Sequence, residues 1–376
     1  MPAGAGRVSV QNRSTVAGEH SLAPEDEADL LRLAAGLVAI PSVSRSEEAL
    51  AGFVEARLRA RGRGLSVDRI GNCVVARTGR GLARRVILSG HLDTVPGVQG
   101  ARVEDDELTG LGAVDMKGGL AVMLLLAEQV ESNPCDTTFV FYDGEELGSE
   151  RSGLTRLFAQ RPDLVAGDFA VVLEPTGNWL EAGCQGTAVF EVVFNGKRAH
   201  SARPWLGVNA VARAVPALNR LASCSTVTEE VEGLLYRGSL QVVGLQAGVA
   251  TNVLPDECII QVSRRYAPSH TLEEVTDEVR RLADGADRLT VLRSSPAGRP
   301  RLDHPLVAAF QRDLGLRVRP KLGTTDVGRF SLVGIPAVNF GPGSAEMAHT
   351  SHEVLSASAL SRSFQGLSRF LGLKEE

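Results

Sequence analysis

The chain has 376 residues, of which 43% are hydrophobic and 23% charged, close to the average for globular proteins. This length allows more than one domain and a sizeable buried core. The net charge of −5 is spread along the chain, and the sequence shows no basic cluster that would bind nucleic acid or an anionic membrane surface. Because no apolar run approaches the ~20 residues that span a bilayer, we expect neither a nucleic-acid partner nor a membrane partner.

The beginning of the chain and the cysteines bear on the location of the protein. Residues 1–22 lack the apolar stretch of a secretory signal, and we predict that they form a mobile extension. The cysteines form no CxxC pair, and their odd number and wide scatter suit reduced thiols in a cytoplasmic protein. They are Cys73, Cys135, Cys184, Cys224 and Cys258.

In chain order, the first predicted elements are helices, followed by alternating strands and helices. Apolar residues have helical spacing over residues 25–61, with a break at Pro41 and Ser42. The alternation then runs through the segments VILSG, GLAVMLLLAEQV, TTFVFYDG, SGLTRLFAQ and FAVVLEP. This order predicts an α/β domain with a doubly wound, mainly parallel sheet.

After Gly186 the order of the predicted elements changes. Strands are predicted at TAVFEVVFNG, SLQVVGLQAG, ECIIQVSRRYAP and RLTVLRSS, with a helix after the first strand and another before the last. This βαββαβ order is ferredoxin-like. Because the α/β pattern returns from about Pro305, we predict that residues 188–297 form a domain inserted into a larger one of residues 23–187 and 298–376.

Acidic and histidine side chains stand where predicted strands end. Ligands of open α/β sheets bind outside the carboxyl ends of the strands, so these side chains are expected to lie close together. Imidazole and carboxylate groups are typical ligands of zinc, cobalt and manganese in hydrolytic sites, and a carboxylate can bridge two ions. The candidates are His91 and Asp93 after VILSG, Asp115 in the loop LTGLGAVDMKGG, Asp143, Glu145 and Glu146 after TTFVFY, Glu174 after FAVVL, and His349 beyond AVNFGPG.

Each candidate also has a simpler explanation when it is taken alone. A carboxylate at a strand end is often a helix cap or a solvated turn residue, and His91 could be an ordinary hydrogen-bonded histidine. The glycine-rich loop is similar to a dinucleotide fingerprint, but Asp115 stands where the third glycine belongs and would repel a pyrophosphate. The sequence contains no GxSxG motif, which disfavours a serine hydrolase.

Six motifs together resemble one known family. They occur in the family's order and cover the chain from about Leu31 to its end: HLDTVP (91–96), GLGAVDMKGG (110–119), DGEELGS (143–149), LEPT (173–176), RAHSARPW (198–205) and GPGSAEMAHTSHE (341–353). They look like the zinc-dependent amidohydrolases and metallopeptidases, a family that includes succinyl-diaminopimelate desuccinylase, acetylornithine deacetylase, aminoacylase and several carboxypeptidases.

The resemblance implies two divalent metal ions per subunit. Zinc is the first expectation, and the same nitrogen and oxygen ligands also accept cobalt or manganese. Asp115 would bridge the ions, and the peptide bond after it is often cis in this family. The remaining ligands would be His91 and Glu174 for one ion, and Glu146 and His349 for the other.

Two further acidic residues receive roles from the same resemblance. Asp93 would hydrogen-bond the far ring nitrogen of His91 and so fix its tautomer. Glu145 would take a proton from the attacking water and deliver it to the leaving amine. His349 and His352 compete for the last ligand position, and the family pattern, a glutamate four residues after the ligand, selects His349 with Glu353.

His200 is expected to act across a dimer interface. An ordinary hydrogen-bonded histidine at the end of a strand is the alternative. In relatives, the histidine of this motif helps to stabilise the tetrahedral oxyanion in the partner's site. The resemblance therefore implies a homodimer that forms through the inserted domain, which would act as a lid.

Several other residues match substrate-binding positions of the family. Arg264 and Arg265 are neighbours on a predicted strand, so at most one points into the cleft, and the family position favours Arg265. Gln185 is a departure, because many desuccinylases carry an arginine there. The predicted substrate-binding residues are Thr187, Asn252, Arg265, Gly323 and Thr324.

These features predict a cytoplasmic two-metal hydrolase that cleaves the amide of an N-acylated amino acid. N-succinyl-LL-2,6-diaminopimelate is the first expected substrate, since GCQGT, RAHSARPW and YDGEE occur together as in an actinobacterial branch of the desuccinylases. The alternatives are another N-acyl amino acid, a dipeptidase or carboxypeptidase activity, and a non-catalytic binding relative. The last is disfavoured because the base and all five ligands are present.

Overall fold

The structure is a computed structural model that describes residues 24–98, 100–350 and 352–373. The extension predicted over residues 1–22 lies outside the described residues. Among the helices of the described part, none is long and apolar enough to cross a membrane.

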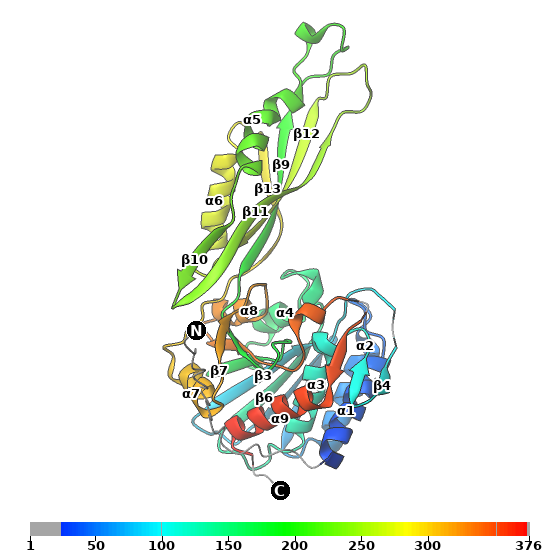
Figure 1. The fold of residues 1–376 in the computed structure, drawn as a ribbon, viewed down its shortest axis with the longest axis vertical. Coiled ribbons are helices and arrows are strands. Elements are labelled where there is room, and N and C mark those ends of the chain that lie inside the picture. Colours follow the sequence, from blue (N-terminus) through cyan, green and yellow to red (C-terminus); the bar gives the residue numbers. More distant parts are fainter. Residues whose placement is uncertain (1–23, 99, 351, 374–376) are drawn as a thin grey trace, which may run out of the picture.

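A mixed eight-stranded sheet forms the centre of the large domain (Figure 1). Its strand order is β1-β2-β6-β3-β7-β15-β8-β14, and the four central strands β6, β3, β7 and β15 are parallel to one another. The predicted doubly wound, mainly parallel sheet is thereby confirmed. The strands are β1 (Leu65–Ile70), β2 (Cys73–Thr78), β3 (Arg85–His91), β6 (Asp136–Tyr142), β7 (Phe169–Val172), β8 (Leu180–Ala182), β14 (Val318–Pro320) and β15 (Ala337–Asn339).

Helices pack on both faces of this sheet. The last helix shows why: its buried residues recur at helical spacing, Leu360, Phe364, Leu367 and Leu371, so one face of it turns towards the core. This helix packs with α1 and α3 on one face of the sheet, while α4 and α8 enter a separate apolar cluster with the other face. The helices are α1 (Pro24–Ala39), α2 (Glu48–Arg61), α3 (Gly118–Ala127), α4 (Gly153–Gln160), α7 (Pro305–Asp313), α8 (Val327–Leu332) and α9 (Ala357–Leu371).

A small three-stranded sheet joins distant parts of the chain beside the large one. Strands β4 (Arg102–Glu104) and β5 (Glu107–Thr109) form a hairpin, and β16 (Val354–Ser356) pairs with β5. The Gly110 backbone N–H also donates to the carbonyl oxygen of Glu353, over 3.2 Å. This pairing brings the end of the chain against the glycine-rich loop that contains Asp115.

The second region is a five-stranded antiparallel sheet with two helices, which we call the lid (Figure 1). Strand order β11-β12-β9-β13, with a helix after β9 and another after β12, is the predicted ferredoxin-like arrangement. Strand β10 was not predicted; it adds a hairpin at the edge of the sheet. The elements are β9 (Gly186–Asn195), α5 (Ala210–Ala222), β10 (Val227–Val231), β11 (Leu234–Ala247), β12 (Glu257–Tyr266), α6 (Leu272–Leu282) and β13 (Arg288–Ser295).

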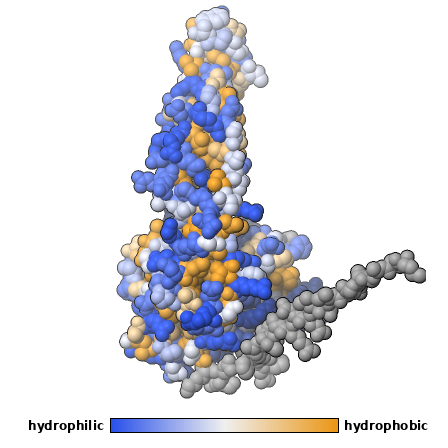
Figure 2. All heavy atoms as spheres, turned by 60° about the vertical axis from the view of Figure 1, so that its left-hand side comes forward, coloured by the Kyte–Doolittle hydropathy of each residue, from blue (hydrophilic) through white to orange (hydrophobic). Residues whose placement is uncertain are grey.

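The lid has its own core and extends away from the large domain. Alternate residues of β9, such as Phe190 and Phe194, pack together with Ile260 of β12 against the two helices, among whose buried residues is Val279 of α6. In Figure 2 the lid forms a narrow stalk on the broader large domain. The boundaries at 187/188 and 297/298 remain our proposal, close to where β9 begins and β13 ends.

The lid joins the large domain where its two connecting segments lie side by side. Cys184 and Gly298 exchange backbone hydrogen bonds, at 2.9 and 3.0 Å between nitrogen and oxygen. The hydroxyl of Tyr236, at the base of β11, donates to the carbonyl oxygen of Ala182 over 2.7 Å. The start of β11, which precedes the predicted strand segment SLQVVGLQAG, therefore supports the base of the lid.

Candidate active site

The carboxyl ends of the parallel strands bring the predicted ligands together. His91 is the last residue of β3, Glu145 and Glu146 follow β6, and Glu174 lies two residues beyond β7. Within the described residues, three sets each have their ligand atoms within 4.8 Å of one another: His91 with Asp115 and Glu174, His91 with Glu145 and Glu146, and Asp115 with Glu146 and His349.

Asp115 lies between the two histidines. Its Oδ1 is 3.0 Å from Nε2 of His91, and its Oδ2 is 3.3 Å from Nε2 of His349. The Asp115–Met116 peptide bond is cis, as expected. The carboxylate of Glu353 accepts the backbone N–H groups of Val114 (2.9 Å) and Asp115 (3.3 Å), which fixes this segment from the far end of the chain. Asp115 thus offers one oxygen to each side of the site.

The other two predicted ligands, Glu174 and Glu146, lie on opposite sides of Asp115. Glu174 Oε1 is 3.9 Å from Nε2 of His91, and Glu146 Oε1 is 2.7 Å from Nε2 of His349. The first pair is buried, whereas the side chain of His349 is 49% exposed. The more open side therefore faces solvent, from which a substrate would come.

Asp93 holds the segment that carries both glutamates. Its Oδ1 accepts the backbone N–H of Glu145 (3.0 Å), and its Oδ2 accepts that of Glu146 (3.2 Å). Nδ1 of His91 lies 2.9 Å from the backbone oxygen of Asp93 and 3.5 Å from its carboxylate. The backbone oxygen is thus the closer partner of the ring, and the carboxylate mainly orients Glu145 and Glu146.

Glu145 lies in a helical turn, Glu145–Leu147, directly after Gly144. Gly144 has φ +70°, and a Cβ there would approach the carbonyl oxygen of Arg151 to 2.6 Å, so this sharp turn requires glycine. Nη1 of Arg329 lies 3.7 Å from Oε1 of Glu145. Arg329 is 5% exposed and pairs with Asp326; neither residue was predicted from the sequence.

The crowded carboxylates alter each other's proton affinity. Burial, together with the charge of Asp115, raises the pKa of Glu174 to about 8, and burial raises the pKa of Glu145. Hydrogen bonds to Asp115 and Glu146 raise the pKa of His349 to about 10. Bound protons thus compensate the clustered negative charge, and bound divalent cations would do the same. The side chains offer nitrogen and oxygen atoms, which zinc, cobalt and manganese accept as ligands. The residues fit two such ions.

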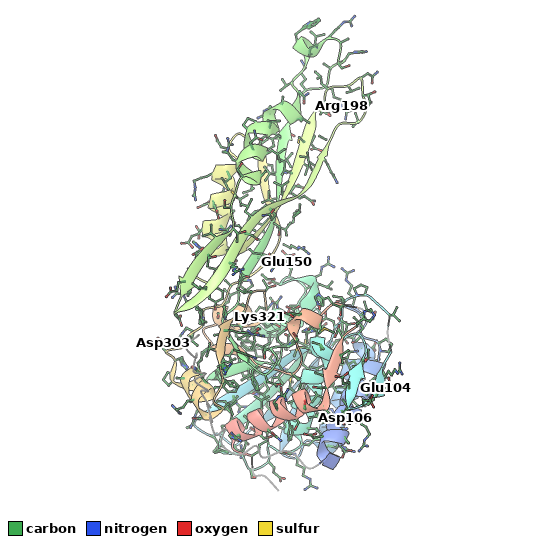
Figure 3. The ribbon with its side chains drawn as sticks, in the orientation of Figure 1. Glu104, Asp106, Glu150, Arg198, Asp303 and Lys321 are labelled. Carbon is green, nitrogen blue, oxygen red and sulfur yellow. The ribbon has the colours of Figure 1, made fainter. Side chains whose placement is uncertain are left out.

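A second cationic group at the site was also missed by the sequence analysis. Lys321, in the large domain (Figure 3), is 8% exposed, and its Nζ lies 2.9 Å from Oε2 of Glu181. Arg319 already pairs with the same carboxylate, at 2.7 Å. The negative charges of Glu174 and Glu181 raise the pKa of Lys321 in spite of its burial. No spacing in the sequence links these residues, because β8 and β14 pair only in the fold.

Other predicted residues lie away from the ligand cluster. His200 is exposed and pairs with Val253 beside Asn252, near Arg198, which Figure 3 places towards the far end of the lid. The structure therefore does not bring His200 or Asn252 to the predicted ligands of the same subunit. His352 is exposed and belongs to none of the three ligand sets.

The remaining substrate-binding candidates lie at the base of the lid and in a neighbouring loop. Arg265 and Thr187 are cross-strand partners, and Arg265 is exposed, whereas Arg264 is buried and pairs with Glu278 at 2.9 Å. The carbonyl oxygen of Gly323, which precedes Thr324, accepts the N–H of Gln185 at 2.9 Å. Gln185 itself is 3% exposed, and its amide donates to the carbonyl oxygen of Arg237.

Comparison with known proteins gives the class of this protein. The family model described as peptidase family M20/M25/M40 matches residues 87–372, and the chain belongs to this family. A putative succinyl-diaminopimelate desuccinylase of Mycobacterium tuberculosis is 42% identical over 92% of this chain and 98% of its own length. The succinyl-diaminopimelate desuccinylase of Corynebacterium glutamicum is 40% identical over 86% of this chain and 91% of its own.

Solved structures have the same fold. A tripeptidase from Staphylococcus aureus aligns with a TM-score of 0.75 and 22% identity, over 92% of this chain and 97% of that one. The YXEP protein of Bacillus subtilis, described as a dinuclear metal binding peptidase, aligns with a TM-score of 0.69 and 16% identity over the same shares. The resemblance inferred from the six motifs is confirmed, and with it the enzyme class, a hydrolase of the M20/M25/M40 family.

Replacing Asp93 by alanine should weaken metal binding without removing a ligand. Loss of its carboxylate removes the acceptor of the Glu145 and Glu146 N–H groups and a close neighbour of the His91 ring. Such supporting partners contribute about 10–100-fold to the affinity of a site for its metal. The measurement is competition for zinc with a chelating indicator. Asp136→Ala is the matched control: Asp136 is equally buried and also accepts backbone N–H groups, but at the opposite end of β6. Equal affinity in the two variants would contradict this role of Asp93.

Proposed function

We propose that this protein hydrolyses the amide bond of an N-acylated amino acid, and that N-succinyl-LL-2,6-diaminopimelate is its substrate. The products would be succinate and LL-diaminopimelate. The observation that carries the proposal is the ligand cluster around Asp115, which has Glu145 beside it. The substrate follows from two relatives at 40% and 42% identity that are named for this activity.

The residues around Asp115 are proposed to hold two divalent ions. Asp115 would bridge them; zinc is the first candidate, and cobalt and manganese are alternatives with the same ligand preferences. When bound, the ions supply Lewis acidity to the scissile carbonyl group and to the attacking water. His91 with Glu174, and Glu146 with His349, would complete the two sides.

Glu145 is proposed to move the proton. It would accept a proton at its carboxylate as water attacks the carbonyl carbon, and deliver that proton to the nitrogen of the leaving amine. Its raised pKa brings the carboxylate closer to the working pH, which favours both the acceptance and the return of a proton. The hydrogen bond from its N–H to Asp93 and the nearby charge of Arg329 keep it in place.

We further propose a homodimer that forms through the lid, in a cytoplasmic protein. Apolar side chains lie exposed along the lid (Figure 2), among them Val243 (58%), Leu245 (53%), Val249 (64%) and Leu292 (43%). Figure 2 shows apolar residues gathered along the lid, and a contiguous exposed apolar patch is typical of an interface. The five cysteines are unpaired, which suits a reducing compartment.

A substrate panel tests this function. Metal-reconstituted protein is assayed with N-succinyl-diaminopimelate, N-acetylornithine, other succinyl and acetyl amino acids, and simple dipeptides. We expect the highest kcat/KM for N-succinyl-diaminopimelate. The residues proposed to bind this substrate are Arg265, Asn252, Thr187, Gly323 and Thr324. A preference for dipeptides would replace the proposed function by a peptidase activity on the same ions.

Glu145→Gln should separate proton transfer from metal binding. The amide keeps the size of the side chain but cannot accept the proton, so turnover should fall by about 10²–10⁴ while the metal content stays unchanged. Metal content is measured by atomic emission and turnover with the best substrate of the panel. Glu150→Gln, a change of a nearby exposed glutamate, is the control. Loss of metal together with activity would instead make Glu145 a ligand.

His200→Ala tests catalysis across the dimer. If His200 stabilises the oxyanion in the partner's site, kcat should fall by roughly 10²–10³ with the dimer intact. Mixing His200→Ala with Glu145→Gln should then restore activity, because a mixed dimer contains one site with both residues. Near-normal turnover of His200→Ala alone, or no restoration in mixtures that exchange subunits, would exclude the role.

A further inference from the structure

A second set of contacts, besides those of Asp93, holds the start of the segment that carries Glu145 and Glu146. Nη2 of Arg156, on α4, donates to Oδ1 of Asp143 over 2.6 Å. The thiol of Cys73, on β2, donates to the same oxygen over 3.1 Å, and Arg156 also lies 3.4 Å from this sulfur. Cys73 is fully buried, and burial together with Asp143 raises its pKa to about 12, so the thiol remains a donor.

The start of α4 packs directly against this cluster. The N–H of Gly153 donates to the carbonyl oxygen of Asp143 over 2.7 Å. A Cβ at Gly153 would lie 2.1 Å from Oδ1 of Asp143 and 2.4 Å from Sγ of Cys73. No larger residue than glycine fits without moving the carboxylate, so the position of Asp143 is set by its neighbours on β2 and α4.

The negative charge around Asp143 explains why the guanidinium group of Arg156 lies beside it. Asp143 adds a negative charge two residues from Glu145, in a region that already contains Asp93 and the ligand carboxylates. The Asp143 side chain is 17% exposed and that of Arg156 32%. Removing the cation from a half-buried pair leaves the carboxylate without compensation, and it would turn towards water and pull on its segment.

We propose that Arg156 is a positioning residue, which acts through Asp143 to keep Glu145 and Glu146 in register with the rest of the site. This inference rests on the proposed function, in which the first glutamate moves the proton and the second is a ligand. Asp93 holds this segment through the N–H groups of Glu145 and Glu146, and Arg156 and Cys73 hold it through the carboxylate of Asp143. Displacement of a reacting group by about 1 Å can cost ~10²-fold in rate, so both supports matter.

The experiment compares Arg156→Met with Arg156→Lys, which keeps the charge. Arg161→Met is the matched control, because Arg161 follows the same helix and pairs with the exposed Asp163. Hydrogen exchange of a peptide covering residues 143–149 is followed by mass spectrometry in the zinc-loaded protein. kcat, KM and metal content are measured on the same samples, with the best substrate of the panel.

In Arg156→Met, exchange in the 143–149 peptide should be roughly tenfold faster while other peptides keep the wild-type rate. kcat should fall by about 10–100-fold with little change in KM, and Arg156→Lys should recover part of it. Arg161→Met should behave as wild type. A wild-type exchange rate and kcat in Arg156→Met, or an equal loss in Arg161→Met, would overturn the proposal.

A second variant displaces the same carboxylate without removing the cation. Gly153→Ala should move Asp143 sterically and reproduce the faster exchange and the lower kcat, whereas Gly52→Ala, on α2 with open space around it, should not. Wild-type behaviour of Gly153→Ala would count against the proposal. The exchange measurement needs no substrate, so a failure of the proposed function in the substrate panel remains distinguishable from a failure of this inference.

Discussion

The gathering of four carboxylates, Asp115, Glu145, Glu146 and Glu174, around two histidines is the constraint on which the rest of the structure depends. Like charges at this separation repel, and burial increases the cost because water no longer screens them. The fold imposes this arrangement, because the parallel strands end at one edge of the sheet and the side chains that follow them lie there together. Compensation comes from the histidines, from Arg329 and Lys321 at the margins, and from the proposed divalent ions.

Two buried acidic residues that are not proposed ligands have parallel tasks. Asp93 accepts the N–H groups of Glu145 and Glu146, and Glu353 accepts those of Val114 and Asp115. In each case a carboxylate from a distant part of the chain fixes the backbone of a segment that carries site residues. Main-chain hydrogen bonds to these two carboxylates therefore help to position the predicted ligands Asp115 and Glu146.

Much of this arrangement could be predicted from the sequence, because strand ends and ordered motifs are local features. His91, Asp115, Glu146, Glu174 and His349 were placed together on that basis, and the ferredoxin-like order of the lid follows from the periodicity of its segments. The hairpin strand β10 was missed because VTEEV is short and charged. Arg329, Lys321 and Arg156 were missed for a different reason: their spacing forms no motif, and only the fold brings Arg329 to Glu145, Lys321 to Glu181 and Arg156 to Asp143. Gln185 was noticed as a departure, but its hydrogen bond to the backbone of Arg237 was beyond any pattern of spacing.

The insertion of the lid has a consequence for the order in which the site is made. His91, Asp115 and Glu174 all precede the lid in the chain, whereas His349 follows it. At about 5–20 residues per second, a ribosome needs roughly 10–35 s to travel from Glu174 to His349. Strand β15 lies between β7 and β8 in the sheet. Strands β7 and β8 can therefore join one sheet only after Ala337–Asn339 has been synthesised. One of the two proposed ion sites thus has all its residues early, and the other is completed only near the end of synthesis.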